Sequence, residues 1–333
     1  MKVVKGTPKH LFRTGELLDF TYLMLNLEFS CNYQCLKCFN QGTNTPQYSK
    51  NNILTFNDQI SLIQQAKEMG GKVVVIAGEG EPSIHKDIRT LITEIKSRDM
   101  IPIIYSNGRL LTKDITEFYK KSNAVIIISL DSLEPQKYDL LTGTKNQLEQ
   151  VLTNINWIRE IYKDAIIKKD DLTIISFAIN TTVSRINQNE IANIKELCKD
   201  DIYFICNPLA KLGSAAQTWE TLMKNETDSD KYTHLAEQMS EAGGPLTLGT
   251  NGLCNYSSNG IAVSPYGHYM TCAYTSLTND LLGTVKNKSL KEAYLYKHKM
   301  EKTNYATNGP AKCLVRANSF QKYLSLLKEQ PIK

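Results

Sequence analysis

The feature that most constrains the fold is a regular alternation of short apolar segments and longer amphipathic segments between residues 22 and 210. The apolar segments are rich in β-branched residues, which is typical of buried parallel strands, and the longer segments have helical periodicity. The expected strands are Tyr22–Phe29, Lys72–Ala77, Ile101–Tyr105, Ala124–Leu130, Leu172–Val183 and Asp201–Cys206. The expected helices are Asn57–Met69, His85–Arg98, Lys113–Lys121, Lys145–Tyr162 and Asn189–Lys199.

This alternation predicts an α/β fold in which parallel strands are joined by right-handed helical crossovers. Six strands with five helices make up most of six strand–helix units, two short of a closed eightfold barrel, so we expect an open, partial (β/α)6 TIM-like barrel. Ligand-binding groups should then lie at the carboxyl ends of the strands.

The alternation and the segments outside it divide the chain into four expected regions. Residues 1–21 form an N-terminal extension, 22–212 the partial barrel, 213–245 a helical connector that ends at Gly243-Gly244-Pro245, and 246–333 a small α+β domain. Short strand signals with turn residues mark the last region.

Charge and hydropathy exclude several classes of protein. The net charge of +5 comes from 39 basic and 34 acidic residues that are interspersed, which argues against a dedicated nucleic-acid-binding protein. The longest apolar run, Ala124–Leu130, is too short to cross a bilayer, and the N-terminus lacks the apolar region of a signal peptide. We therefore expect a cytoplasmic protein with no nucleic-acid or membrane partner.

Three of the eight cysteines crowd into one short segment, Cys31, Cys35 and Cys38, in a C-x3-C-x2-C pattern directly after the first strand. Disulfides are not expected in a reducing cytoplasm, so this crowding favours metal or redox chemistry. Three thiolates on one loop can hold a cubane iron–sulfur cluster and leave one iron open. The alternative is a zinc site, which needs a fourth ligand; the nearest downstream candidate is His85.

This motif, placed after the first strand of a partial barrel, resembles that of the radical S-adenosylmethionine (radical SAM) superfamily. The resemblance implies a [4Fe-4S] cluster on Cys31, Cys35 and Cys38, with the methionine part of SAM bound at the open iron. An electron from the cluster then cleaves SAM to methionine and a 5'-deoxyadenosyl radical, which removes a hydrogen atom from the substrate. It also implies an electron donor such as flavodoxin or ferredoxin.

Motifs at the later strand ends extend the resemblance. The segment 78–82 (GEGEP) is similar to the family's GGEP segment, with Glu79 where the first glycine is usual, and Tyr105–Gly108 is similar to its TNG turn. By this resemblance the expected SAM contacts are Gly78, Gly80, Glu81, Ser106, Asn107, Ser129, Asp131 and Asn180. The chain departs from the family at Lys37, where an aromatic residue near the adenine is usual; Phe39 is the expected substitute.

The order of Cys254, Cys272 and Cys313 resembles that of the Twitch unit, the shorter form of the SPASM extension. The resemblance implies a second, auxiliary [4Fe-4S] cluster. The usual ending C-x2-C reads Cys313-Leu-Val-Arg316 here, so one cysteine is missing. The cluster then keeps an open iron for substrate, takes a ligand from elsewhere such as Cys198 or a histidine, or the site is degenerate.

The two remaining cysteines have different expected roles. Cys198 lies on an expected helix and suits core packing. Cys206 ends the sixth expected strand, where its thiol could donate a hydrogen atom to a substrate radical or pack as a small apolar residue.

Three functions follow from these observations. The first is dehydrogenation or epimerisation of a small hydroxylated or aminated substrate of the aminocyclitol or sugar type, by an oxidoreductase or epimerase. The second is modification of a ribosomally made peptide by epimerisation, thioether formation or crosslinking. The third is a non-catalytic zinc or iron–sulfur binding protein, which leaves the polar motifs at successive strand ends unexplained. A catalytic base cannot be assigned among Lys211, Arg185, Tyr203 and His268.

Overall fold

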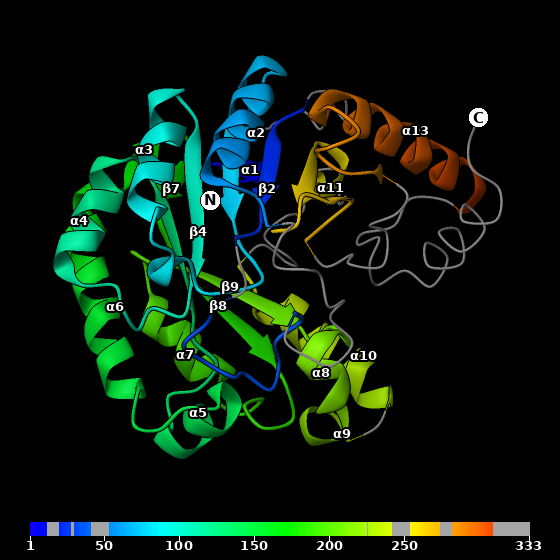
Figure 1. Ribbon diagram of the computed structural model, residues 1–333. Coiled ribbons are helices and arrows are strands. Elements are labelled where there is room, and N and C mark those ends of the chain that lie inside the picture. The colour runs from blue at the N-terminus through cyan, green and yellow to red at the C-terminus, as the bar shows by residue number, and fades with distance from the viewer. Residues whose placement is uncertain are drawn as a thin grey trace.

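The computed structural model describes residues 1–11, 20–27, 30–40, 53–224, 226–241, 254–273 and 282–308 (Figure 1). The strands are β1 (Lys2–Val4), β2 (Tyr22–Leu25), β3 (Val73–Ile76), β4 (Ile101–Ser106), β5 (Val125–Ser129), β6 (Ile167–Lys169), β7 (Leu172–Ile175), β8 (Phe177–Val183), β9 (Tyr203–Pro208), β10 (Gly260–Val263) and β11 (Tyr269–Met270). The helices of the first half are α1 (Pro8–Leu11), α2 (Phe56–Glu68), α3 (Ile88–Ser97), α4 (Lys113–Lys121), α5 (Pro135–Thr142) and α6 (Leu148–Tyr162). Those of the second half are α7 (Ile191–Cys198), α8 (Gly213–Gln217), α9 (Trp219–Leu222), α10 (Glu226–Met239), α11 (Asn255–Ser258) and α13 (Leu290–Asn308).

The main sheet has eight strands in the order β11-β10-β2-β3-β4-β5-β8-β9. Every pair from β10 to β9 is parallel, and only β11 runs antiparallel to its neighbour. Among the described strands β9 and β11 stand at opposite edges and do not pair, so the sheet is not a closed barrel. The expected α/β fold, an open parallel sheet with helical crossovers, is confirmed.

The two faces of this sheet pack differently because successive side chains of a strand point to opposite sides. Leu23 of β2 and Ile104 of β4 belong to the large core cluster, which also contains the apolar residues of the crossover helices. Tyr22 of β2 and Ile103 of β4 belong to a smaller cluster without those helices. Figure 1 shows α3, α4 and α6 together on one outer side of the sheet. The smaller cluster therefore marks the inner face of the partial barrel.

Local sequence signals set the helix starts. Thr55 caps α2 in a capping box with Asp58, in which each side chain accepts from the other residue's backbone N–H. Thr112 caps α4, which spans the expected Lys113–Lys121. Helix α3 begins later than expected, at Ile88, because Pro82–Ile84 form a separate 3-10 turn after the glutamate motif. The short helix α5, which the sequence analysis did not predict, follows β5.

The expected strand Leu172–Val183 was wrong as a single element. It consists of β7, which pairs with β1 and β6 in a separate three-stranded sheet, and β8, which joins the main sheet between β5 and β9. Ser176 separates the two strands. Both halves are rich in β-branched residues and no glycine or proline separates them, so the sequence pattern does not reveal that the chain leaves one sheet for another.

The segment after residue 254 continues the main sheet. β10 pairs in parallel with β2, in the register Gly260 to Tyr22 and Val263 to Leu25, and β11 then turns back along β10. Helix α13 lies beside α11 at the same edge (Figure 1). Within the described residues, no helix combines the length and apolar character needed to span a membrane.

Candidate active site

The loop that carries Cys31, Cys35 and Cys38 is fixed to two helices on either side. On one side the Gln34 and Leu36 backbone N–H groups donate to the carbonyls of Thr142 and Leu141, both at 3.0 Å, at the end of α5. On the other side α8 donates from the Ala215 N–H to the Cys38 carbonyl at 3.2 Å. The path of the loop is therefore set by backbone contacts before any metal is bound.

Two glycines allow these contacts. Gly143 has φ +64° and a Cβ there would lie 2.5 Å from the Gln34 carbonyl oxygen; Gly213 has φ +53° and a Cβ there would lie 2.4 Å from the Phe39 carbonyl. Both positions require the left-handed region and a close approach, which glycine provides at least cost. These glycines bring α5 and α8 against the cysteine loop.

The three cysteines of this loop form no disulfide with any described residue, and all three are partly exposed. Burial raises the pKa of the Cys31 and Cys35 thiols, and their neighbouring cysteines raise it further. The Lys37 ammonium lowers the pKa of Cys35. Thiols close enough to influence one another, on one loop, are a suitable donor set for an iron–sulfur cluster. Across the described part of the chain, no three Cys, His, Asp or Glu side chains already surround one metal position, so the thiols must turn toward a common point.

Glu81 joins the cysteine loop to the end of β4. Its carboxylate, 5% exposed, accepts from the Ser106 hydroxyl at 2.7 Å, the Asn107 N–H at 2.7 Å and the Ser83 N–H at 3.0 Å. Its own N–H donates to the Ser30 carbonyl at 2.8 Å. The expected residues Glu81, Ser106 and Asn107 therefore lie together, and Ser30, to which Glu81 donates, directly precedes Cys31.

Asn107 makes a second link that the sequence analysis missed. Its side-chain amide donates to Asn32 Oδ1 at 2.7 Å, inside the cysteine motif. Asn32 Nδ2 is buried without a hydrogen-bond partner among the described residues. The motif gives no signal for this contact, because it depends on how β4 ends beside the loop.

Asp131, after β5, is 2% exposed and is held by β8. One carboxylate oxygen accepts from the Thr182 N–H at 2.8 Å and the other lies 2.5 Å from the Lys37 ammonium. Lys37 also donates to the Thr182 hydroxyl at 3.3 Å. Lys37, which stands where the family usually has an aromatic residue, thus forms an ion pair that links the cysteine loop to the strand ends.

The remaining expected contacts stand on adjacent strands. Ser129 of β5 and Asn180 of β8 are partners in the sheet register, and both are partly exposed. Asn180 Oδ1 accepts from the Asn207 amide at 2.6 Å. Phe39, the expected adenine contact, lies partly exposed against Gly213.

Gly78 and Gly80 form a tight turn after β3. The Gly80 N–H donates to the Gly78 carbonyl at 2.5 Å, and Gly78 has φ +142°. A Cβ on Gly78 would lie 2.4 Å from Asn26 Oδ1, so the turn packs directly on this buried amide. Glu79 stands between the two glycines.

Glu79 should make the protein less stable as the pH rises. Burial raises the pKa of its carboxyl to about 7 from 4.5, while the Asn26 amide lowers it. Because the folded state holds this proton more tightly, the stability is fully present below pH 4.5 and is lost as the pH approaches 7. We expect Glu79→Gln to gain roughly 1–3 kcal/mol over the wild type at pH 8 and little at pH 4.5, by urea denaturation at both values. An equal difference at the two pH values would contradict the assignment.

Cys206 and Cys198 lie outside this group of side chains. Both are completely buried in the large cluster on the helix-covered side, and burial raises the pKa of each thiol to about 12. Ile205, the residue before Cys206 in β9, belongs to the inner-face cluster. Because successive side chains of a strand point to opposite faces, Cys206 points away from the inner face. This placement matches the alternative of a packed cysteine and differs from the expected position for a hydrogen donor.

The segments that carry Cys254 and Cys272 are in contact beside β10. Ser257, three residues after Cys254, donates to the Thr271 carbonyl at 3.2 Å, next to Cys272. Cys313 lies outside the described residues. The auxiliary site on Cys254, Cys272 and Cys313 therefore stays a prediction.

A buried ion pair supports this second region. The Lys297 ammonium lies 2.8 Å from Glu301 on α13, and the two side chains are 0% and 2% exposed. Lys297 also donates to the Ser257 carbonyl, and the Ser257 hydroxyl donates to Glu301 at 2.9 Å. The pair fixes α13 to the segment that follows Cys254, and the sequence analysis did not single it out.

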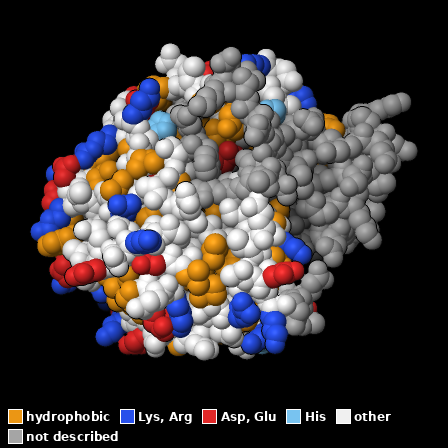
Figure 2. Space-filling view, turned by 60° about the horizontal axis from the view of Figure 1, so that its bottom comes forward, with side chains coloured by type: hydrophobic (Ala, Val, Ile, Leu, Met, Phe, Trp, Pro, Cys, Tyr) orange, Lys and Arg blue, Asp and Glu red, His pale blue; other side chains and the backbone are white. Residues whose placement is uncertain are grey.

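Figure 2 shows one face of the molecule, on which acidic and basic side chains are intermixed. No broad patch of one sign covers the described part of that face. This agrees with the interspersed charges of the sequence.

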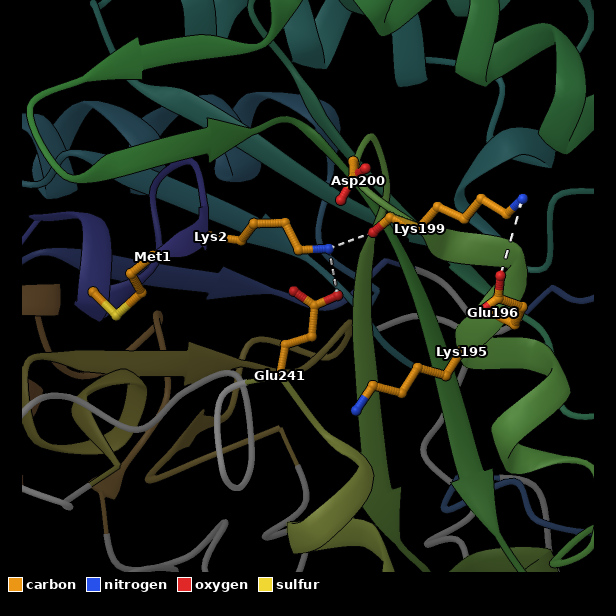
Figure 3. Close-up of a pocket in the computed structure, with 7 residues that line it drawn as sticks. All are labelled: Met1, Lys2, Lys195, Glu196, Lys199, Asp200 and Glu241. Atoms are coloured by element: carbon orange, nitrogen blue, oxygen red, sulfur yellow. Dashed lines mark hydrogen bonds and ion pairs between the residues drawn. The ribbon is translucent and has the colours of Figure 1, made fainter.

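A pocket of about 460 Å³ lies elsewhere (Figure 3). It is lined by Met1, Lys2, Lys195, Glu196, Lys199, Asp200 and Glu241. Lys2 is engaged there by the Lys199 carbonyl at 2.6 Å and by Glu241 at 2.7 Å. The pocket lies beside the beginning of β9, whereas sites of such folds lie at the carboxyl ends of the strands. Its lining residues come from the N-terminus and β1, from α7 and the turn after it, and from the segment after α10.

The part of the chain that contains the cysteine loop and the ends of β3, β4 and β5 matches a known protein family. Residues 26–177, from the end of β2 to the start of β8, match the Radical SAM superfamily. This part of the chain, somewhat less than half of it, is similar to a radical SAM domain. This domain contains Cys31, Cys35 and Cys38 together with Glu81 and Asp131, so the resemblance read from the motifs is confirmed.

Relatives by sequence match the same region. The GTP 3',8-cyclase of Haemophilus influenzae strain 86-028NP is 30% identical over 145 residues, which cover 43% of this chain and 42% of the cyclase. The GTP 3',8-cyclase of Vibrio cholerae serotype O1 strain ATCC 39541 is 30% identical over 144 residues, with the same coverage of 43% and 42%. The match spans less than half the length of these curated relatives.

Solved structures resemble the chain over more of its length. Streptococcus suis SuiB bound to S-adenosylmethionine has a TM-score of 0.61 at 16% identity and covers 94% of this chain and 75% of its own. The anSMEcpe structure with bound AdoMet has a TM-score of 0.54 at 14% identity, covering 93% and 97%. These likenesses support the open α/β fold.

Proposed function

We propose that the protein is a radical SAM enzyme that removes a hydrogen atom from a small hydroxylated or aminated substrate of the aminocyclitol or sugar type. The observation that carries the proposal is the fixed cysteine loop, with Glu81 and Asp131 tied to it from the segments that follow β3 and β5. When bound to Cys31, Cys35 and Cys38, a [4Fe-4S] cluster with SAM supplies the 5'-deoxyadenosyl radical.

The chain's own residues prepare this site. Ser106 and the Asn107 N–H hold the Glu81 carboxylate in place, where its remaining acceptor capacity suits the SAM ammonium. Ser129 and Asn180 present partly exposed polar groups from neighbouring strands, which suit the ribose hydroxyls. α5 and α8 fix the cysteine loop and limit its exposure to water.

Anaerobic reconstitution tests the proposal. The protein is expected to turn brown with iron and sulfide, to bind SAM, and to release 5'-deoxyadenosine when reduced. Deuterated aminocyclitols or amino sugars should pass label into 5'-deoxyadenosine. A colourless, zinc-loaded protein that leaves SAM intact would exclude radical chemistry and support the non-catalytic alternative.

The second candidate is modification of a ribosomally made peptide. It is supported by the SuiB fold, which covers 94% of this chain, because SuiB has also been solved bound to its precursor peptide SuiA. The label-transfer assay therefore needs a peptide arm, and a GTP arm because of the cyclase relatives. Label from only one of the three substrate classes identifies the activity.

We also propose a second [4Fe-4S] cluster on Cys254, Cys272 and Cys313 in residues 246–333. Its support is the contact between the segments that carry the first two cysteines, in which the Ser257 hydroxyl donates to the Thr271 carbonyl at 3.2 Å. Cys313→Ala is expected to lower the iron content by up to half while SAM cleavage without substrate continues. Iron and sulfide counts equal to those of the wild type would contradict this second site.

Cys206→Ala should change product distribution if its thiol donates hydrogen, and leave it unchanged if it only packs.

A further inference from the structure

Lys37 is placed in the cysteine loop by two groups that belong to other elements. Its ammonium lies 2.5 Å from the Asp131 carboxylate, after β5, and 3.3 Å from the Thr182 hydroxyl of β8. Asp131 is itself held by the Thr182 N–H at 2.8 Å. A flexible side chain is thus confined to one position.

The confined charge stands beside the thiols. Lys37 lies between Cys35 and Cys38 in the same loop, and its ammonium is held 2.5 Å from the Asp131 carboxylate. The Lys37 and Asp131 side chains are only 14% and 3% exposed. Water therefore screens their charges poorly, and their influence on a neighbouring charge is stronger than at the surface.

We propose that Lys37 is a positioning residue that raises the reduction potential of the cluster held by Cys31, Cys35 and Cys38, and that Asp131 fixes and partly offsets its charge. This inference rests on the proposed function, since it needs the cluster. The electron comes from a one-electron reductant of the flavodoxin or ferredoxin class and adds one negative charge to the cluster. A nearby cation stabilises the reduced state and a nearby anion destabilises it.

A redox titration of the reconstituted protein, followed by electron paramagnetic resonance, tests the inference without measuring turnover. At the potential where half of the wild-type clusters are reduced, clearly fewer than half should be reduced in Lys37→Met. Lys37→Arg keeps the charge and should stay near half. Asp131→Asn removes the opposing charge, and clearly more than half should be reduced.

The double variant Lys37→Met with Asp131→Asn should return toward half, because both charges are gone. Equal midpoint potentials in all variants with full iron content would overturn the inference and leave the proposed function standing. If Lys37→Met assembles no cluster, Lys37→Arg and Asp131→Asn still decide the outcome, since an unchanged potential in Asp131→Asn contradicts it. Failure of the wild type to assemble a cluster would instead remove the proposed function and this inference with it.

Discussion

The triple variant in which Cys31, Cys35 and Cys38 become alanine is expected to lose reductive cleavage of SAM completely. The cysteine loop supplies all three thiolates proposed for the first cluster, and Cys198 and Cys206 are sealed in the core and cannot replace them. Because α5 and α8 hold the loop through its backbone, the fold should survive the loss of the thiols. The measurements are 5'-deoxyadenosine release under dithionite, iron content, and the circular dichroism spectrum.

Cys198→Ala is the matched control for this experiment. It removes one buried sulfur and should cost about 1 kcal/mol of stability through the lost packing, without changing cluster content. Full 5'-deoxyadenosine production by the triple variant would refute the assignment of the first cluster. Loss of iron in Cys198→Ala would instead show that this cysteine takes part in a metal site.

The strand–helix alternation made the main sheet predictable, because each apolar strand lies between helices of clear periodicity. The strand-like segment from Leu172 to Val183, which contains no glycine or proline, concealed a change of sheet at Ser176. The strand β1 and the parallel pairing of β10 with β2 were also beyond sequence reasoning, since both join segments far apart in the chain. Such pairings depend on tertiary packing and leave no local pattern.

The candidate site, like the fold, was predictable from the sequence only in part. The motifs placed Glu81, Ser106, Asn107 and Asp131 at strand ends, and the structure ties these residues to the cysteine loop. The motifs could not indicate that Lys37 reaches Asp131, because its reach depends on how β5 and β8 end beside the loop. Likewise, Cys206 occupies the right strand end but the wrong face, which one residue of register decides.

Glu81→Ala is expected to have the largest effect of any single substitution at the strand ends. It leaves the Asn107 and Ser83 N–H groups and the Ser106 hydroxyl without their carboxylate acceptor. Each buried donor left unpaired costs about 1–3 kcal/mol, and part of this is recovered if water enters the space. We therefore expect a loss of about 2–4 kcal/mol in the free energy of unfolding, measured by urea denaturation.

The same substitution should weaken SAM binding, because it removes the carboxylate proposed to accept from the SAM ammonium, which also holds the Ser106–Asn107 turn beside the cysteine loop. A loss of at least tenfold in SAM affinity, measured by calorimetry on the reconstituted protein, is the expected result. Glu79→Gln is the matched control, two residues away in the same turn, whose side chain makes none of these three bonds. Comparable losses in both variants would mean that the turn as a whole carries the effect, and an unchanged affinity in Glu81→Ala would remove this carboxylate from the SAM site.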